Sequence, residues 1–184
     1  MKIKISKIDA AKSQILTAIH LFFEERDPVS IHTLIGAGME IVHDHITDKG
    51  LVWDKNLILH PDTIYIKDEY RKEWQDRIRK DKNFFKHADR DIKKGITETE
   101  FDPKINEFYI MEAIRALGVI QPDFWPPEFK AFTMWFIKKN PKVLSEDAKD
   151  ERDLIKQLQL NAKSDYKKAI DLLNEYPERF IKKA

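Results

Sequence analysis

The distribution of proline residues is the feature that most restricts how this chain can fold. Its 184 residues contain eight prolines but only five glycines, and the stretches between prolines carry apolar residues at helical rather than alternating spacing. In the first stretch, Ile8, Ala11, Ile15, Ile19 and Phe22 recur every three or four residues and would share one helix face. The pattern predicts a series of helices separated at or near prolines.

Several prolines follow residues that cap helix N-termini. Asp27-Pro28 and Asp102-Pro103 each combine a capping side chain with a proline suited to the first helical turn. Lys49-Gly50 and Gly118 mark expected helix ends. The predicted helices span about residues 9–26, 28–48, 61–83, 103–118, 126–140 and 145–176, with a candidate break in the last near residues 161–164, where Ser164-Asp165 forms a second cap.

The length and composition favour one core. A chain with 42% hydrophobic and 11% aromatic residues can bury a substantial interior at this size. We find no repeat, low-complexity tract or linker, so the sequence predicts an all-α fold, a compact bundle of five or six helices, in a single domain over residues 1–184. The aromatic residues from Phe124 to Phe136 recur at helical spacing, which favours core packing over a ligand cage.

Charge and cysteine content exclude several classes of protein. The 33 basic and 32 acidic residues give a net charge of +1, which argues against a protein that is basic over its whole surface. There is no cysteine, so disulfides, thiolate catalysis and thiolate zinc sites are excluded. Residues 1–7 lack the apolar segment of a signal peptide, and no apolar run approaches the roughly 18 residues that cross a bilayer. We therefore expect a cytoplasmic protein without membrane contact or cofactor.

The near-neutral charge conceals a basic segment. Residues 71–86 contain seven basic and three acidic side chains, a local balance of +4, with Trp74, Phe84 and Phe85 interleaved. Cations beside aromatic rings suit a phosphate backbone with stacked bases. A solvated helix face with its aromatic rings turned inward gives the same pattern. The cations assigned to nucleic-acid binding are Arg71, Arg77, Arg79, Lys80 and Lys86.

Within this segment, Lys82-Asn83 and the later His87 form a more specific motif. It resembles the motif of the HEPN superfamily (higher-eukaryote and prokaryote nucleotide-binding domains), in which an arginine and a polar residue precede a histidine by a few positions. In this chain Lys82 replaces the arginine. The resemblance is confined to this motif and the general fold class. It implies an all-helical up-and-down bundle that binds RNA or nucleotide, often as a homodimer with its active residues at the dimer cleft.

The same resemblance implies roles for the three residues in a metal-independent ribonuclease. His87 would act as general acid or base at the ribose 2′-hydroxyl, Lys82 would stabilise the developing phosphorane charge, and Asn83 would orient His87 or the phosphate. Lysine supplies charge without the bidentate geometry of arginine, so the motif also suits a module that binds RNA without cleaving it. Residues 27–34 and 83–91 also resemble parts of a small bacterial family, which implies no particular function.

A metal site at the end of the basic segment is an alternative. His87, Asp89 and Asp91 would lie on one side of an extended chain. One imidazole with carboxylate oxygens suits manganese, iron or zinc. A surface network between these carboxylates and neighbouring cations accounts for the same residues.

A second candidate metal site lies on the second predicted helix. His32 and His43 return to nearly the same face, and Glu40 and His43 form a Glu-x-x-His pair like those of di-iron bundles. A half-buried polar stripe, with Gly36 allowing close helix contact, explains these residues too. His20 is expected to pair with Glu24, four residues later. A protein-interaction module without chemistry is the third functional class.

Overall fold

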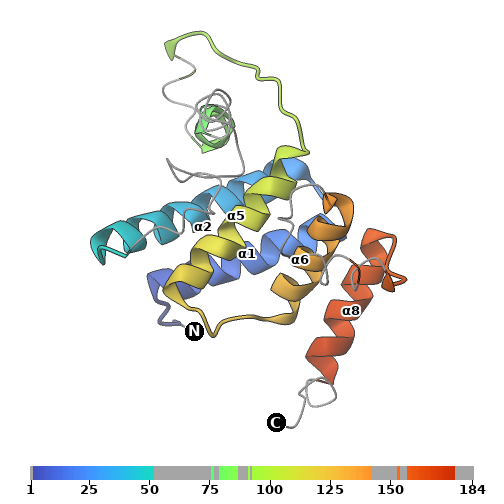
Figure 1. The fold of residues 1–184 in the computed structure, drawn as a ribbon. Helices are drawn as coiled ribbons and strands as arrows, with labels where there is room; N and C mark the ends of the chain where they lie inside the picture. Colours follow the sequence, from blue (N-terminus) through green and yellow to red (C-terminus); the bar gives the residue numbers. More distant parts are fainter. Residues whose placement is uncertain are drawn as a thin grey trace.

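The structure is a computed structural model that describes residues 2–51, 76, 79–86, 91, 93–141, 153 and 157–176. Within these residues, helices pack against helices. The helices given there are α1 (Lys7–Phe23), α2 (Pro28–Asp48), α5 (Ile105–Ile120), α6 (Pro127–Lys139) and α8 (Lys163–Glu175). Residues 79–86 form a further helical segment. The predicted all-α bundle is confirmed (Figure 1).

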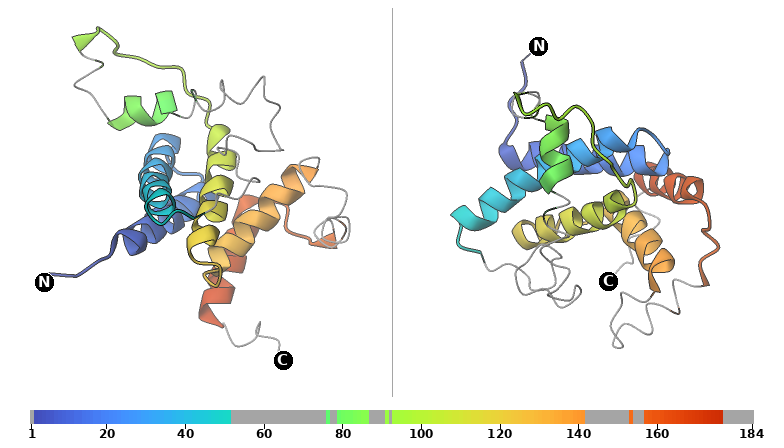
Figure 2. Two further views of the ribbon diagram at one scale, coloured as in Figure 1. Left: turned by 60° about the vertical axis from the view of Figure 1, so that its left-hand side comes forward. Right: turned by 90° about the horizontal axis from the view of Figure 1, so that it is seen from above.

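The helices share one buried core. α1 and α2 form a hairpin, α5 packs against α2, and α8 packs against α6 and α1. Figure 2 shows the green 79–86 segment lying over α2, outside the layer that α1, α2 and α5 form. Within the described residues, no helix combines the length and the apolar character needed to cross a membrane.

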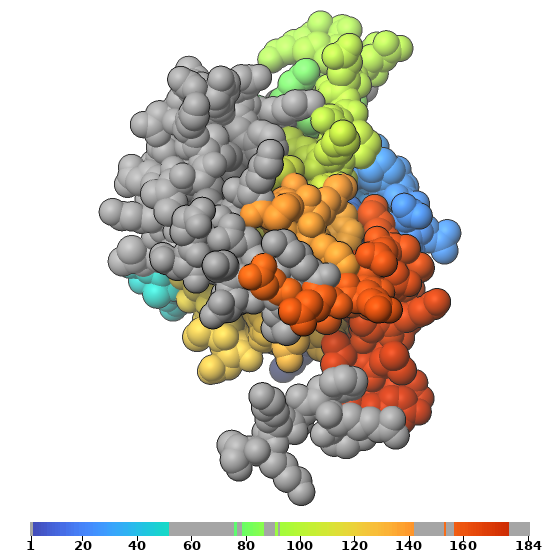
Figure 3. All heavy atoms as spheres, turned by 45° about the vertical axis from the view of Figure 1, so that its right-hand side comes forward, coloured from blue at the N-terminus to red at the C-terminus, as the bar shows by residue number. Residues whose placement is uncertain are grey.

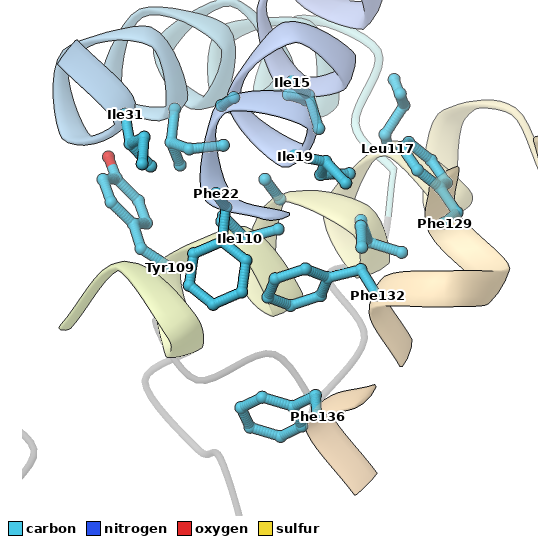
Figure 4. Packing of buried hydrophobic residues seen from close by; sticks show 14 of the residues in the cluster. Ile15, Ile19, Phe22, Ile31, Tyr109, Ile110, Leu117, Phe129, Phe132 and Phe136 are labelled. Carbon is cyan, nitrogen blue, oxygen red and sulfur yellow. The ribbon is translucent and has the colours of Figure 1, made fainter. Parts of the chain in front are cut away.

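The core is built from the faces that the sequence pattern indicated. Ile15 and Ile19 of α1 are fully buried, and the ring of Phe22 contacts Phe132 and Trp135 with centroid distances of 5.2 and 4.7 Å. Figure 4 shows side chains from α1, α5 and α6 pointing into this shared interior. The aromatic residues of α6 are therefore core residues, as predicted, although Trp125 just before α6 is exposed.

Two glycines of α2 allow close approach on different sides. A Cβ atom added at Gly38 would lie 3.0 Å from Cγ1 of Ile15 and 3.3 Å from the carbonyl oxygen of Ala11, so Gly38 sets the α1–α2 contact. A Cβ atom at Gly36 would lie 2.8 Å from Cγ of Lys82, so Gly36 sets the approach of the 79–86 segment. The predicted role of Gly36 in close packing is confirmed.

Helix boundaries agree with the predicted signals at both ends of α2 and of α6. Asp27 caps α2 by accepting a hydrogen bond from the Ser30 amide at 2.8 Å, and hydrogen bonding from Ser30 lowers the pKa of Asp27. α1 begins earlier than predicted because Ser6 caps it, accepting from the Asp9 amide at 3.0 Å.

The predicted break before α8 is confirmed, since residues 158–162 are not helical. Its predicted cap at Ser164 is wrong, because α8 begins at Lys163 and the Asp165 side chain accepts from the backbone amide of Ala162 at 2.9 Å.

Several predicted helix boundaries are wrong. α1 ends at Phe23, earlier than the predicted end near Arg26. α5 begins at Ile105 with no side-chain cap, so Asp102 and Pro103 precede the helix and do not start it.

α5 continues through Gly118 to Ile120 because Val119 and Ile120 still pack against the core, and packing outweighs the low helix propensity of one glycine. The helical residues of the basic segment continue to Lys86, beyond the predicted end between residues 80 and 83.

α1 and α2 end in the same hydrogen-bonding pattern, with different residues at the left-handed position. At the end of α1, the Arg26 amide donates to the Leu21 carbonyl at 2.9 Å, and Glu25 has a φ of 54°. At the end of α2 the equivalent residue is Gly50, with a φ of 59°. Both ends are Schellman motifs, but only Gly50 avoids the steric cost of a left-handed backbone.

Replacing Glu25 by glycine is therefore expected to raise the free energy of unfolding by about 0.5–1 kcal/mol, since relief of the left-handed strain exceeds the added chain entropy. Urea denaturation measures the change. Lys49→Gly is the matched control, because Lys49 has an ordinary φ of −81° and glycine there adds only flexibility. A loss of stability in Glu25→Gly as large as in Lys49→Gly would contradict the interpretation.

Candidate functional site

The 79–86 segment has a polar outer face and a buried inner face. At 100° per residue, Arg79, Lys82, Asn83 and Lys86 fall within an arc of about 100°, and Lys82 lies at the edge of that arc, with its stem against Gly36 of α2. Arg79, Asn83 and Lys86 are exposed, as is Lys80 beside them, whereas Lys82 is half-buried. The inner face carries Asp81, which is only 1% exposed, with half-buried Phe84 and Phe85.

Aromatic contacts hold the inner face against α2 and the chain that precedes α5. The centroid of the Phe85 ring lies 5.7 Å from that of the His32 imidazole and 5.1 Å from that of the Phe101 ring, and both contacts are edge-on. The ring of Tyr109 also packs against His32, with the two ring centroids 5.2 Å apart. Phe85 is therefore turned inward, as the alternative interpretation of the aromatic pattern predicted, and it does not serve as a stacking platform for bases.

His32 is a structural link between α2 and α5. Its side chain is fully buried, and its Nδ1 lies 2.8 Å from Oδ1 of Asn106. The Asn106 amide nitrogen donates to the carbonyl oxygen of Pro28 at 2.9 Å. Since Nδ2 of Asn106 faces the Pro28 carbonyl, its Oδ1 faces His32 and must accept a hydrogen bond there. The donor is Nδ1 of His32, so this ring nitrogen carries a proton.

Glu40 pairs with both lysines on its side of the segment. Its Oε2 accepts a hydrogen bond from Nζ of Lys86 at 2.8 Å and lies 3.9 Å from Nζ of Lys82. The Lys82 stem reaches Glu40 across Gly36. The ammonium group of Lys82 is thus directed toward α2, where a carboxylate competes with any phosphate for it.

The metal site proposed on α2 is not formed. His32 and His43 share a face but stand about 16 Å apart along the axis, since each residue advances a helix by about 1.5 Å. His43 is exposed beside Asp44, with an Nδ1–Oδ1 distance of 3.5 Å, while Glu40 pairs with lysines. Among the described residues, no group of three or more histidine, aspartate and glutamate side chains could hold a metal ion.

Part of the predicted site lies outside the described residues. The predictions for Arg71, Arg77, His87 and Asp89 fall there. Asp91 is described, and its backbone carbonyl accepts hydrogen bonds from the amides of Lys94 and Ile96 in the turn that follows. The structure thus brings Lys82, Lys86 and Glu40 together, with His32 buried beneath Phe85.

Sequence reasoning overlooked the polar residues on the buried face of α5. Asn106 and Glu112 are each 1% exposed, and burial raises the pKa of Tyr109 well above its usual value, with the charges of Glu112 and Glu40 acting in the same direction. Polar side chains at three-residue spacing within an apolar helix are the signal that would have indicated them.

His20 also has a different partner from the one predicted. Its Nε2 lies 3.1 Å from Oε1 of Glu128 on α6, not beside Glu24. The same carboxylate oxygen accepts from the side-chain amide of Asn174 at 3.2 Å. His20, Glu128 and Asn174 thus connect α1, α6 and α8, and this hydrogen-bonded cluster has a structural role.

Comparison with known proteins finds no family model, curated protein or solved structure that matches this chain.

Proposed function

We propose that this protein binds RNA or a nucleotide through the outer face of the 79–86 segment. The observation that supports this most is the exposure of Arg79 and Lys80, which form no ion pair with any described residue. Lys86 and Asn83 lie on the same solvent-facing side. Arginine and lysine carry only hydrogen-bond donors, and closely spaced exposed cations are the usual partners of phosphate oxygens.

Binding is the core of the proposal, and ribonuclease activity is an extension of it. Cleavage would use His87, the next residue after Lys86, as the general acid or base. Lys82 is a weaker candidate for stabilising a transition state because Glu40 lies 3.9 Å from its ammonium group. We therefore expect RNA affinity to be easier to detect than turnover.

Removing two cations tests the proposal. Arg79→Gln with Lys80→Gln is expected to weaken binding of a labelled single-stranded RNA about tenfold, measured by fluorescence anisotropy. The slope of log affinity against log salt should fall by about 1.4, or roughly 0.7 for each lost phosphate contact.

Lys7→Gln with Lys130→Gln is the matched control. Lys7 lies on α1 and Lys130 on α6, and both are exposed. Their replacement removes two positive charges, as the Arg79→Gln and Lys80→Gln changes do. RNA binding that is insensitive to salt, or equal weakening by the two double variants, would overturn the proposal.

Light scattering on the wild-type protein tests whether it forms the homodimer that the HEPN resemblance implies.

Neutralising Glu40 is expected to have the opposite effect. Glu40→Gln removes the carboxylate that pairs with Lys82 and Lys86, so both ammonium groups become available to phosphate, and RNA affinity should rise about threefold to tenfold. Asp44→Asn is the control, because it removes one exposed charge from the next turn of α2 beside a histidine. An equal gain in both variants would mean that only net charge matters.

A further inference from the structure

A polar groove lies between the turn that follows α1 and the start of α8. It has a volume of about 600 Å³ and adjoins a smaller pocket of about 250 Å³ near the start of α5. Glu25, Arg26 and Lys163 border both spaces. Figure 3 shows, at its right-hand side, blue atoms of the N-terminal region next to orange-red atoms at the start of α8. Neither space includes a residue of the 79–86 segment.

The lining of these two spaces is more basic than the protein as a whole. It contains five cations and three carboxylates, a balance of +2, whereas the whole chain has a net charge of +1. One of these carboxylates, Glu107, is already paired with Lys139, which lies outside the lining. The cations are Arg26, Lys104, Lys163, Lys167 and Lys168.

The ion pairs within the groove are long and partly exposed to solvent. Glu24 lies 3.4 Å from Nε of Arg26 and 3.5 Å from Nζ of Lys167. Pairs of this kind contribute little to stability, so a ligand could exchange them at small cost. Among the described residues, Lys104 and Lys168 form no ion pair at all.

Lys163 stands at the junction of the two spaces. Its Nζ lies 3.9 Å from the centroid of the Phe22 ring and 4.0 Å from Oε1 of Glu25, the residue with the left-handed backbone. Burial lowers the pKa of Lys163, with Glu25 opposing that effect. Glu107 acts in the same direction as Glu25. A partly desolvated ammonium group whose nearest carboxylate is this distant gains more from an added anion than a fully hydrated lysine does.

We propose that this groove binds a small phosphate-bearing ligand, with Lys163 and Arg26 donating to the phosphate oxygens. Phosphate suits several convergent cations because it carries more charge and more acceptor oxygens than a carboxylate, and arginine can bind it through two parallel hydrogen bonds. The smaller pocket, lined in part by Pro28, Ile31 and Pro103, would hold the apolar portion. The proposal does not depend on RNA binding by the 79–86 segment.

Titration of isotope-labelled protein with inorganic phosphate and with phenyl phosphate tests this site by NMR. We expect saturable shifts in the amide signals of Arg26, Lys163 and Ser164, with tighter binding of phenyl phosphate. Lys163→Met keeps the aliphatic stem over Phe22 and should weaken binding about tenfold, the loss typical of one charged hydrogen bond. Lys163→Arg should retain most of the affinity.

Lys12→Met is the matched control. Lys12 also lies over a phenylalanine ring, 4.5 Å from the centroid of Phe124, and beside a carboxylate, 3.7 Å from Asp9, but it lines neither space. The absence of saturable shifts with both probes, or unchanged affinity in folded Lys163→Met, would overturn the proposal. The variant with Arg79→Gln and Lys80→Gln should bind phenyl phosphate normally, so failure of either proposal leaves the other testable.

Discussion

Phe132→Ala should lower the free energy of unfolding by about 3–5 kcal/mol, the loss typical of removing a large aromatic side chain from a packed core. Phe132 is fully buried, and its ring contacts Phe22, Trp135 and Phe23 with centroid distances of 5.2, 5.5 and 6.0 Å. These contacts join α1 to α6, so truncation leaves a cavity between two helices that rigid neighbours cannot fill. Urea denaturation followed by circular dichroism measures the loss.

Phe124→Ala provides the comparison. Phe124 is half-buried and contacts Phe129 with a centroid distance of 5.6 Å, but it precedes α6 and lies at the margin of the core. Its truncation should cost about half as much, since less apolar surface returns to water. Equal losses in the two variants would contradict a core centred on the α1–α6 aromatic contact.

Asn106→Leu is expected to lower the free energy of unfolding by about 3 kcal/mol. The change removes both the acceptor for His32 and the donor to the Pro28 carbonyl from a site that is 1% exposed. Each buried polar group left without its partner costs about 1–3 kcal/mol. Thermal and urea denaturation of the variant measure the combined cost.

A double-mutant cycle isolates the contribution of the histidine–asparagine contact. Replacing His32 and Asn106 together by leucine removes both polar partners, so the combined loss should be smaller than the sum of the two single losses. The exposed Asn83→Ala variant should change stability by less than about 0.5 kcal/mol. Strictly additive losses at positions 32 and 106 would show that the contact does not stabilise the fold.

Local signals predicted the elements because the residues that form them are close in sequence. The apolar face of α1 and the Asp27 cap of α2 both depend on residues within a few positions of each other. Gly118 shows where such signals fail, because its role depends on whether the following residues reach a core made by other helices. The same reason accounts for His20, whose partner Glu128 lies 108 residues away.

The sequence predicted the residue types of the candidate site but not their pairings, because the pairings join residues that are far apart in the chain. The polar stripe of α2 and the charge of residues 71–86 are visible in the sequence, and the structure places His32 and Glu40 against the 79–86 segment. The pairings themselves join residues 46 and 74 positions apart, Glu40 with Lys86 and His32 with Asn106. No periodicity or spacing encodes which distant helix supplies the partner.

The missing side chain at Gly36 has a consequence for how the exposed cations are presented. The 79–86 segment can lie this close to α2 only because no Cβ atom separates Gly36 from the stem of Lys82. The height of the segment above α2 therefore depends on a position that carries no charge and touches no ligand. A single methyl group there would act as a spacer and move the lysines away from Glu40 without replacing any charged residue.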